Sequence, residues 1–305
     1  MIEKIIAIVM FAYAIIILPY TIFSLDNNLE ASFFIKKIMQ ELIAALFKYG
    51  IDGKLYINIG NDTPSPINNN KVDVIIANHY TGSIDIMIII NILHHYNIYT
   101  YNFIYNKNNV NYIPGLGLVL KSSYDINVHD YKNIAKIIKK INVCNSKQFM
   151  IIFPEGSITN YSSCIEKAQK YSRENNIHIY NNLLVPRIKG LYVLLNELNK
   201  QDKLGSIWNF TLTNNQDNYY AHIRKLYLNN FNNYNILKKN IYNIWKDKDN
   251  ILENNHKIKY KQIYLRNNYY YFILTIFIIC MQTMILFKLR YFILFLMHII
   301  YHYIY

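Results

Sequence analysis

Hydrophobic residues divide the chain into an uncharged apolar run near each end and a central region where apolar and polar runs alternate. Short runs rich in β-branched and aromatic residues predict strands at 72–77, 101–106, 148–153, 207–213 and 220–228. Apolar residues at helical spacing predict helices at 85–96 and 131–142, and residues 183–199 predict a strand, a turn and a helix. This alternation predicts an α/β fold with a mixed, mainly parallel sheet flanked by helices.

The apolar ends predict N- and C-terminal membrane helices. Residues 5–25 carry no charge, and 21 residues at helical rise span about 31 Å, close to the thickness of the hydrocarbon core. A cleaved signal peptide fits less well, because the run is long and no small-residue cleavage site follows it. Residues 269–287 are also uncharged, whereas residues 291–305 are too short to cross and would pair as a partial hairpin or lie at the interface.

Residues 30–49 have the spacing of an amphipathic helix, and Gly50 suits its end. Such a helix either lies on a bilayer surface or packs on the globular domain. We therefore expect three regions: a membrane anchor with this helix at 1–50, the α/β domain at 51–262, and a hydrophobic membrane segment at 263–305.

Charge and cysteine content narrow the function classes. The formal net charge is +13, but the basic residues are dispersed and form no long tract. Attraction to anionic lipid or to a phosphorylated substrate explains this better than binding to nucleic acid. Cys144, Cys164 and Cys280 are scattered, so they give neither a disulfide framework nor a metal-ligand spacing.

Two segments that follow predicted strands carry candidate chemistry. "NHYTGSID" places His79 just after the strand at 72–77, with Asp85 as the nearest carboxylate. A neutral imidazole there can accept a proton from a hydroxyl, and a carboxylate that fixes its tautomer improves it as a base. "IIFPEGS" gives a buried strand, a proline break, an acid and a glycine. The plain alternatives are a surface histidine and a tight turn with a solvated glutamate.

Two further Gly/Pro turns add candidate binding residues. "YIPGLG" contains Gly115 and Gly117, and "VPRIKG" contains Arg187 and Lys189. An arginine held at a strand end can bind phosphate through two parallel hydrogen bonds, although an ordinary surface arginine is the alternative.

The order and spacing of these four segments resemble the glycerophospholipid acyltransferase family, in particular its lysophosphatidic acid and lysocardiolipin acyltransferase branch. In that branch NH and Asp are followed by a PGFGW segment, by FPEGT, and by PR with a Gly-aromatic helix. Here "NHYTGSID", "IPGLGLVL", "FPEGSITN" and "VPRIKGLYVLL" occupy those places, and "IYNIWKDKDNIL" looks like the branch's Trp- and Lys-rich helix. The resemblance covers roughly residues 55–260.

The sequence departs from the family pattern in two places. Five residues separate His79 from Asp85 where the family has four, and one extra residue on a regular helix would turn the carboxylate by about 100°. Gly82 can absorb the extra residue as a bulge before the helix, with Ser83 as its N-cap. Asp130 stands where the family has an arginine downstream of the PGFGW segment, and Lys132 offers only a point charge.

The resemblance implies transfer of an acyl group from acyl-CoA to a lysophospholipid hydroxyl, with no metal and with acyl-CoA as co-substrate rather than a cofactor. His79 would be the general base and Asp85 would orient it. Substrate would be bound by residues of the other three segments: Gly115, Gly117, Phe153, Pro154, Glu155, Gly156, Arg187 and Lys189.

The implied partners are acyl-CoA, the lysophospholipid and the bilayer, and the implied location is a membrane, that of the endoplasmic reticulum by family analogy. Two other functions stay open at this point. One is a catalytically degenerate, membrane-tethered lipid-binding protein, and the other is a metal-assisted phosphoesterase, for which no compact ligand set is visible.

Overall fold

The computed structural model describes residues 40–41, 43–44, 47–48, 51, 53–65, 71–105, 126–127, 134–135, 138, 148–157 and 162–265. The elements in these ranges are, in chain order, β1 (Lys54–Ile59), β2 (Val72–Ala77), α3 (Ser83–His95), β3 (Tyr101–Tyr105), β4 (Ile126–Asn127), β5 (Gln148–Ile152), α7 (Ser162–Glu174), α8 (Ile188–Lys200), β6 (Leu204–Asn215), β7 (Asn218–Leu226), α9 (Tyr234–Glu253), a 3-10 turn (Asn255–Lys257) and β8 (Lys261–Ile263).

The strands form one sheet in the order β4-β3-β5-β2-β6-β7-β1-β8. β2 pairs in parallel with β5 on one side and with β6 on the other, and β3 pairs in parallel with β5. β7 runs antiparallel to β6, β1 is parallel to β7, and β8 is antiparallel to β1. The predicted mixed, mainly parallel sheet is confirmed. All six residues of β2 are buried, as expected of a central strand that is covered on both faces.

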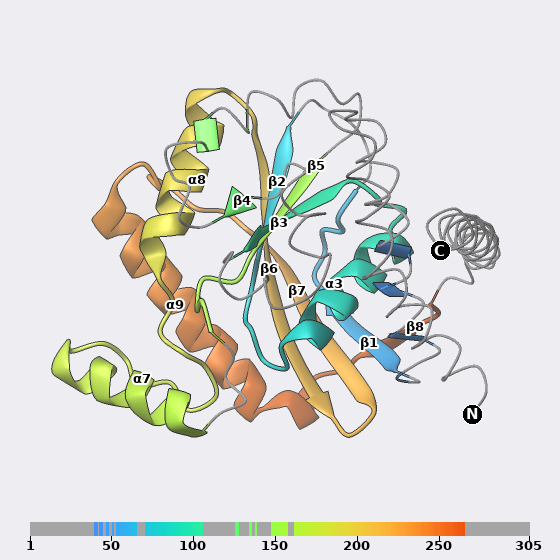
Figure 1. Cartoon of the computed structure of the whole chain (residues 1–305). Coiled ribbons are helices and arrows are strands. Elements are labelled where there is room, and N and C mark those ends of the chain that lie inside the picture. The colour runs from blue at the N-terminus through green and yellow to red at the C-terminus, as the bar shows by residue number, and fades with distance from the viewer. Residues whose placement is uncertain are drawn as a thin grey trace, which may run out of the picture.

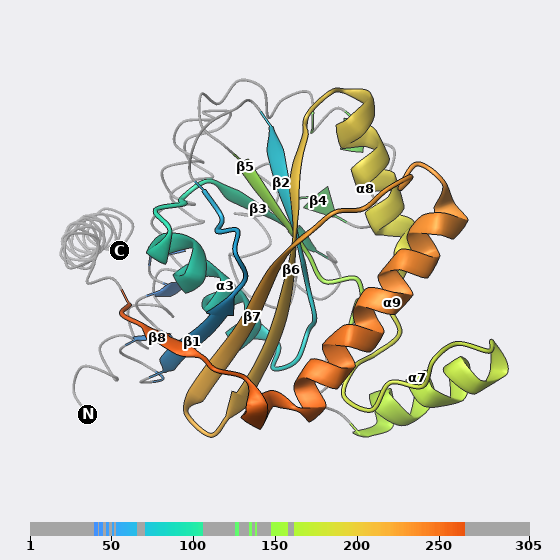
Figure 2. The same ribbon diagram turned by 180° about the vertical axis from the view of Figure 1, so that it is seen from behind.

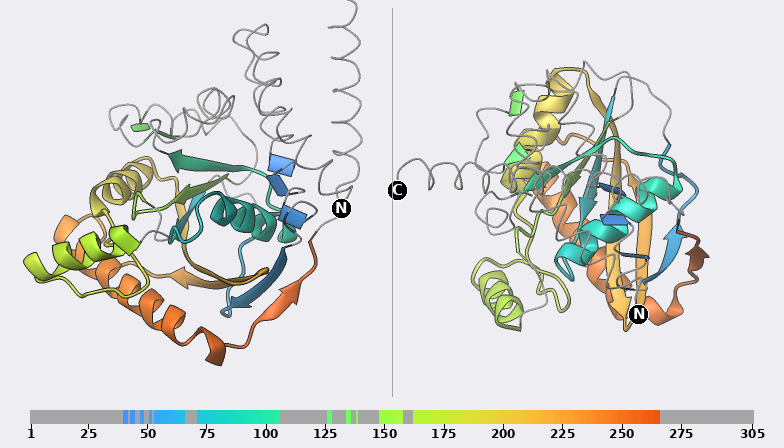
Figure 3. Two further views of the ribbon diagram at one scale, coloured as in Figure 1. Left: turned by 60° about the horizontal axis from the view of Figure 1, so that its bottom comes forward. Right: turned by 45° about the vertical axis from the view of Figure 1, so that its right-hand side comes forward.

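Helices cover both faces of the sheet, α3 on one and α8 with α9 on the other (Figures 1 and 3). Ile88 and Ile92 of α3 pack with Phe210 of β6 in one hydrophobic cluster. Leu191 of α8 and Trp245 of α9 belong to a second cluster on the opposite face. Seen from behind, α7 stands apart from the sheet, to the lower right of α9 (Figure 2). The sheet therefore lies between two hydrophobic cores, one on each face.

The described part of the predicted amphipathic helix packs on the domain. Phe47 is fully buried, and its ring lies 5.1 Å from that of Tyr219 on β7. Gln40 and Glu41 are also buried, and the Lys48 ammonium donates to the Leu265 carbonyl. Of the two alternatives for residues 30–49, these residues support packing on the globular domain.

Both apolar terminal segments lie outside the described residues, so the predicted membrane helices stay predictions. Within the described ranges, none of the helices combines the length and the apolarity that crossing a membrane requires. Of the helix expected at 131–142, residues 134, 135 and 138 are described, and they are helical.

The strand predicted at the start of 183–199 is wrong, whereas the helix after it is confirmed as α8. Both sides of β5 are already occupied by β2 and β3, so this segment has no free position beside them. Just before it, the backbone N–H groups of Asn181 and Asn182 donate to the Asp249 carboxylate on α9 instead of to a neighbouring strand.

Candidate active site

The candidate site begins where β2 ends. The Asn78 side chain is buried and continues the pairing with β6, donating to the Leu212 carbonyl (2.9 Å) and accepting from the Leu212 N–H (2.8 Å). These two side-chain hydrogen bonds take the place of a backbone pair between β2 and β6 at the point where β2 ends. They fix the backbone immediately before His79, which is how a buried strand delivers a histidine to the edge of the sheet.

His79 and Asp85 are in direct contact. The His79 Nδ1 lies 2.9 Å from the Asp85 Oδ2, and the side chains are 20% and 1% exposed, respectively. Because a carboxylate can only accept, the Nδ1 of a neutral His79 carries the proton and the lone pair lies on Nε2. The Asp85 carboxylate also accepts from the Thr81 N–H, the Thr81 hydroxyl (2.7 Å) and the Gly82 N–H (3.1 Å). With donors on both oxygens, its orientation is fixed.

The loop between the two residues accommodates the five-residue spacing. Gly82 has φ 79° and ψ −120°, a conformation that side-chain-bearing residues rarely adopt, and α3 begins immediately after it. Gly82 itself, not Ser83 as predicted, is the N-cap residue. The reason is that the Asp85 carboxylate, in the first turn of the helix, accepts from the Gly82 N–H and so takes over the capping.

The turn after β5 lies against the histidine. The Phe153 ring stacks on the His79 imidazole, with centroids 4.6 Å apart. Glu155 is 2% exposed, so the alternative of a solvated glutamate is wrong. Its Oε2 accepts from the His79 backbone N–H (3.1 Å), and its Oε1 accepts from the indole N–H of Trp245 (3.1 Å). Pro154 is buried in the same turn. Glu155 therefore ties the turn to the backbone of His79.

Gly156 and Arg187 join this turn to the start of α8. Gly156 has φ 66°, and a Cβ built on it would meet the Arg187 guanidinium at 3.4 Å. The Arg187 backbone N–H donates to the Pro154 carbonyl (2.8 Å), while its side chain is exposed. Lys189 is exposed in the first turn of α8. Arg187 thus lies beside the FPEG turn with its side chain towards solvent, and Lys189 follows it by two residues on α8.

A buried lysine lies below the same turn. The Lys248 ammonium, on α9, donates to the carbonyls of Phe210 (2.7 Å) and Ile76 (3.3 Å) and lies 4.5 Å from the centre of the Trp245 ring. Burial lowers its pKa to about 7, partly opposed by the negative charge of Glu155. Burial raises the pKa of Glu155 to about 8, opposed by the His79 N–H, by Lys248 and by the Trp245 indole.

Sequence reasoning did not assign roles to Asn78, Thr81, Trp245 or Lys248. The sequence pattern of α9 could have indicated Trp245 and Lys248. On the buried face of this helix, Lys248 follows an apolar stripe of Leu237, Ile241 and Trp245. A charge at such a position needs a buried partner. Three positions singled out in the sequence, Gly115, Gly117 and Asp130, lie outside the described residues.

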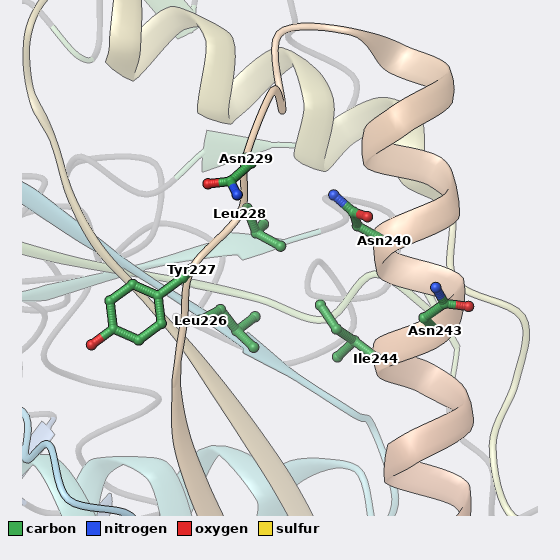
Figure 4. A pocket seen from close by; sticks show the side chains of 7 residues that line it. All are labelled: Leu226, Tyr227, Leu228, Asn229, Asn240, Asn243 and Ile244. Atoms are coloured by element: carbon green, nitrogen blue, oxygen red, sulfur yellow. The ribbon is translucent and has the colours of Figure 1, made fainter.

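Two other features of the described residues bear on the site. In those ranges, no group of three or more His, Cys, Asp or Glu side chains is arranged to hold a metal ion. An open hollow of about 300 Å³ lies between the segment after β7 and α9 (Figure 4). Neither His79 nor Asp85 lines it; the lining residues are Leu226, Tyr227, Leu228, Asn229, Asn240, Asn243 and Ile244.

Comparison with known proteins shows similarity to acyltransferases. Residues 59–186 match the family model described as Acyltransferase. A segment of 69 residues, 23% of this chain, is 32% identical to "Probable 1-acyl-sn-glycerol-3-phosphate acyltransferase 5" of Arabidopsis thaliana and spans 18% of that protein's length. The crystal structure of the 1-acyl-sn-glycerophosphate (LPA) acyltransferase PlsC from Thermotoga maritima superposes with a TM-score of 0.50 at 13% identity, covering 83% of this chain and 97% of that one. At that identity the likeness concerns the fold. Together the comparisons confirm the resemblance drawn from the four motifs.

Proposed function

We propose, from the acyltransferase-family domain at residues 59–186, that this chain is a membrane-bound acyltransferase. It moves a fatty acyl group from acyl-CoA to the hydroxyl of a lysophospholipid, lysophosphatidic acid or a related lipid. The observation that carries the proposal is the contact between His79 and Asp85 at the end of β2, next to the FPEG turn and Arg187.

In the proposed reaction His79 is the general base. Its Nε2 accepts the proton of the lysophospholipid hydroxyl while that oxygen attacks the thioester carbonyl of acyl-CoA. The C–S bond breaks, the acyl ester forms, and the proton passes to the CoA thiolate. Asp85 keeps the proton of neutral His79 on Nδ1 and stabilises the imidazolium that forms during the attack. No covalent acyl-enzyme and no metal are needed.

Binding of the acceptor is assigned to the residues around the FPEG turn. Arg187 binds the phosphate through its guanidinium, and Lys189 adds a second positive charge. Phe153 closes one side of the imidazole, and the turn of Pro154, Glu155 and Gly156 shapes the acceptor pocket. Gly115 and Gly117 would line the cleft, and the apolar terminal segments would hold it at a bilayer surface, where both lipidic substrates reside.

The test is release of CoA by the full chain in nanodiscs, with oleoyl-CoA and a panel of lysophospholipids. We expect release that requires an acceptor and is lost in His79→Ala. The matched control is His256→Ala, because His256 is exposed on the 3-10 turn after α9. Release that survives His79→Ala would exclude His79 as the base.

A lipid-binding protein without catalysis is the competing function. Folded wild type that binds lysophospholipid vesicles but releases no CoA with any acceptor would establish it. The contact between His79 and Asp85 argues against it, because the carboxylate reaches the imidazole despite the five-residue spacing, which departs from the family pattern.

A further inference from the structure

We infer that Trp245 and Lys248 of α9 are positioning residues for His79, and that they act through Glu155 and the end of β2. This inference rests on the proposed function, in which His79 is the base. Neither residue touches the imidazole in any contact described above. Instead they hold the backbone that carries it.

The first path runs through Glu155. One oxygen of this buried carboxylate accepts from the His79 backbone N–H, and the other accepts from the Trp245 indole. A buried carboxylate is stable only when donors or opposite charges compensate for lost hydration. Removal of the indole N–H would leave Oε1 with one donor fewer in a site that water does not reach. The Glu155 side chain would then turn, and its bond to His79 would weaken.

The second path runs through the strand ends. The Lys248 ammonium bridges the Ile76 carbonyl of β2 and the Phe210 carbonyl of β6. These carbonyls lie just before the bridge between Asn78 and Leu212, so the lysine clamps the same two strands one step earlier. It also supplies positive charge to Glu155. α9 therefore fixes the chain around His79 in two places, through Glu155 at His79 itself and through Lys248 at the end of β2.

The charges around this network are few. Asp85 from α3 and Lys248 from α9 face Glu155, while His222 on β7, next to Arg224, faces Lys248. Burial and Asp85 raise the pKa of Glu155, and Lys248 and the Trp245 indole oppose that rise. The geometry carries the inference: Glu155 is hydrogen-bonded to the His79 N–H through one oxygen and to the Trp245 indole through the other, so loss of the indole N–H removes one of these two bonds and lets the side chain turn away from His79.

The experiment compares two Trp→Phe variants in the full chain. Trp245→Phe removes the indole N–H from Glu155, and Trp208→Phe removes the equivalent bond (2.9 Å) from the buried Asp73 at the opposite end of β2. Both remove the same chemical group from a buried carboxylate, so both should cost similar stability. We expect kcat to fall by about 10- to 100-fold in Trp245→Phe, with KM values within about twofold of wild type.

Trp208→Phe should keep the wild-type kcat per folded molecule. Lys248→Met, which keeps the aliphatic stem and removes the charge, should also lower kcat. Equal kcat in the two Trp→Phe variants would overturn the inference for Trp245, and an unchanged kcat in folded Lys248→Met would overturn it for Lys248.

A second readout does not require turnover. The rate of His79 modification by diethyl pyrocarbonate at one fixed pH, followed by mass spectrometry of its peptide, reports how this imidazole is held. We expect this rate to change in Trp245→Phe and to keep its wild-type value in Trp208→Phe. If wild type transfers no acyl group yet this change occurs, the proposed function fails while the positioning role stands. If wild type is active and neither the modification rate nor kcat changes in Trp245→Phe, the positioning role fails alone.

Discussion

Asp85→Asn tests the proposed catalytic pair most directly. The carboxylate accepts from the His79 Nδ1–H, from two groups of Thr81 and from the Gly82 N–H. An asparagine can keep its oxygen towards His79 and Gly82 and turn its amide towards the Thr81 hydroxyl, which can accept. The loop and the histidine tautomer are then retained, and the main loss is the negative charge beside the imidazolium.

The size of that loss follows from the geometry. The Nδ1 and Oδ2 atoms are 2.9 Å apart, so the two charges are centred roughly 4 Å from each other. His79 is partly exposed, and an effective dielectric constant of about 20 then gives about 4 kcal/mol of attraction between imidazolium and carboxylate. An asparagine dipole recovers only a small part of it. We expect kcat to fall by about 10³-fold, since each 1.36 kcal/mol is a factor of about ten.

The assay is CoA release under saturating substrates, with the folded fraction measured by thermal unfolding. The matched control is Asp73→Asn, because the Asp73 carboxylate is also buried and accepts from the Ser206 N–H and the Trp208 indole. That variant should lose stability but keep the wild-type kcat per folded molecule. A folded Asp85→Asn protein with more than about a tenth of the wild-type kcat would show that the charge of Asp85 does not support His79.

Three other changes test separate parts of the structure. Gly82→Ala forces a side chain into φ 79° and ψ −120°, so we expect the unfolding free energy to fall by about 1–3 kcal/mol. If the loop relaxes instead, kcat should fall. An unchanged unfolding free energy together with an unchanged kcat would contradict the strained loop. Arg187→Ala should raise KM for a phosphorylated acceptor by about tenfold or more, with Arg187→Lys intermediate, whereas an equal rise for an uncharged monoacylglycerol would argue against phosphate binding. His222 is buried and its pKa is lowered to about 4 by burial, Arg224 and Lys248, so only the unfolded chain takes up its proton between pH 6.5 and 4. Unfolding free energy should therefore fall as the pH is lowered from 6.5 to 4, and about 3 kcal/mol of that fall should be absent in His222→Gln. Parallel pH curves for the two proteins would contradict this contribution.

Much of the fold could be predicted from local patterns. The β-branched run at 72–77 and the mainly apolar run at 148–152 became adjacent central strands, because a strand buried on both faces is predominantly apolar. The short strands β1 and β8 were missed. β1 pairs with β7, more than 150 residues later in the chain, and β8 pairs with β1 alone among the strands of the described residues. Pairing between segments so far apart leaves no local signal.

The motif residues show the same division. The sequence by itself determined that the histidine and the FPEG turn each follow a strand and that the VPR turn precedes a helix, because strand periodicity and turn-forming residues act over a few positions. It did not decide where Asp85 points, since one residue of spacing rotates a helical side chain by about 100°. The Gly82 conformation decided that, and it depends on the bonds that the folded loop makes to the carboxylate.

Only the tertiary structure decided the role of Glu155 and brought α9 to it. Glu155 and Trp245 are 90 positions apart, and Glu155 and His79 are 76 apart. As a sequence, the turn is compatible with a solvated glutamate, whereas packing of α9 across β2 and β6 buries the carboxylate and supplies its donors. The types of reactive group could thus be predicted from the sequence, because each side chain carries its own functional group. Their distances, burial and charges came from strand order and helix packing, which join residues that no local pattern connects.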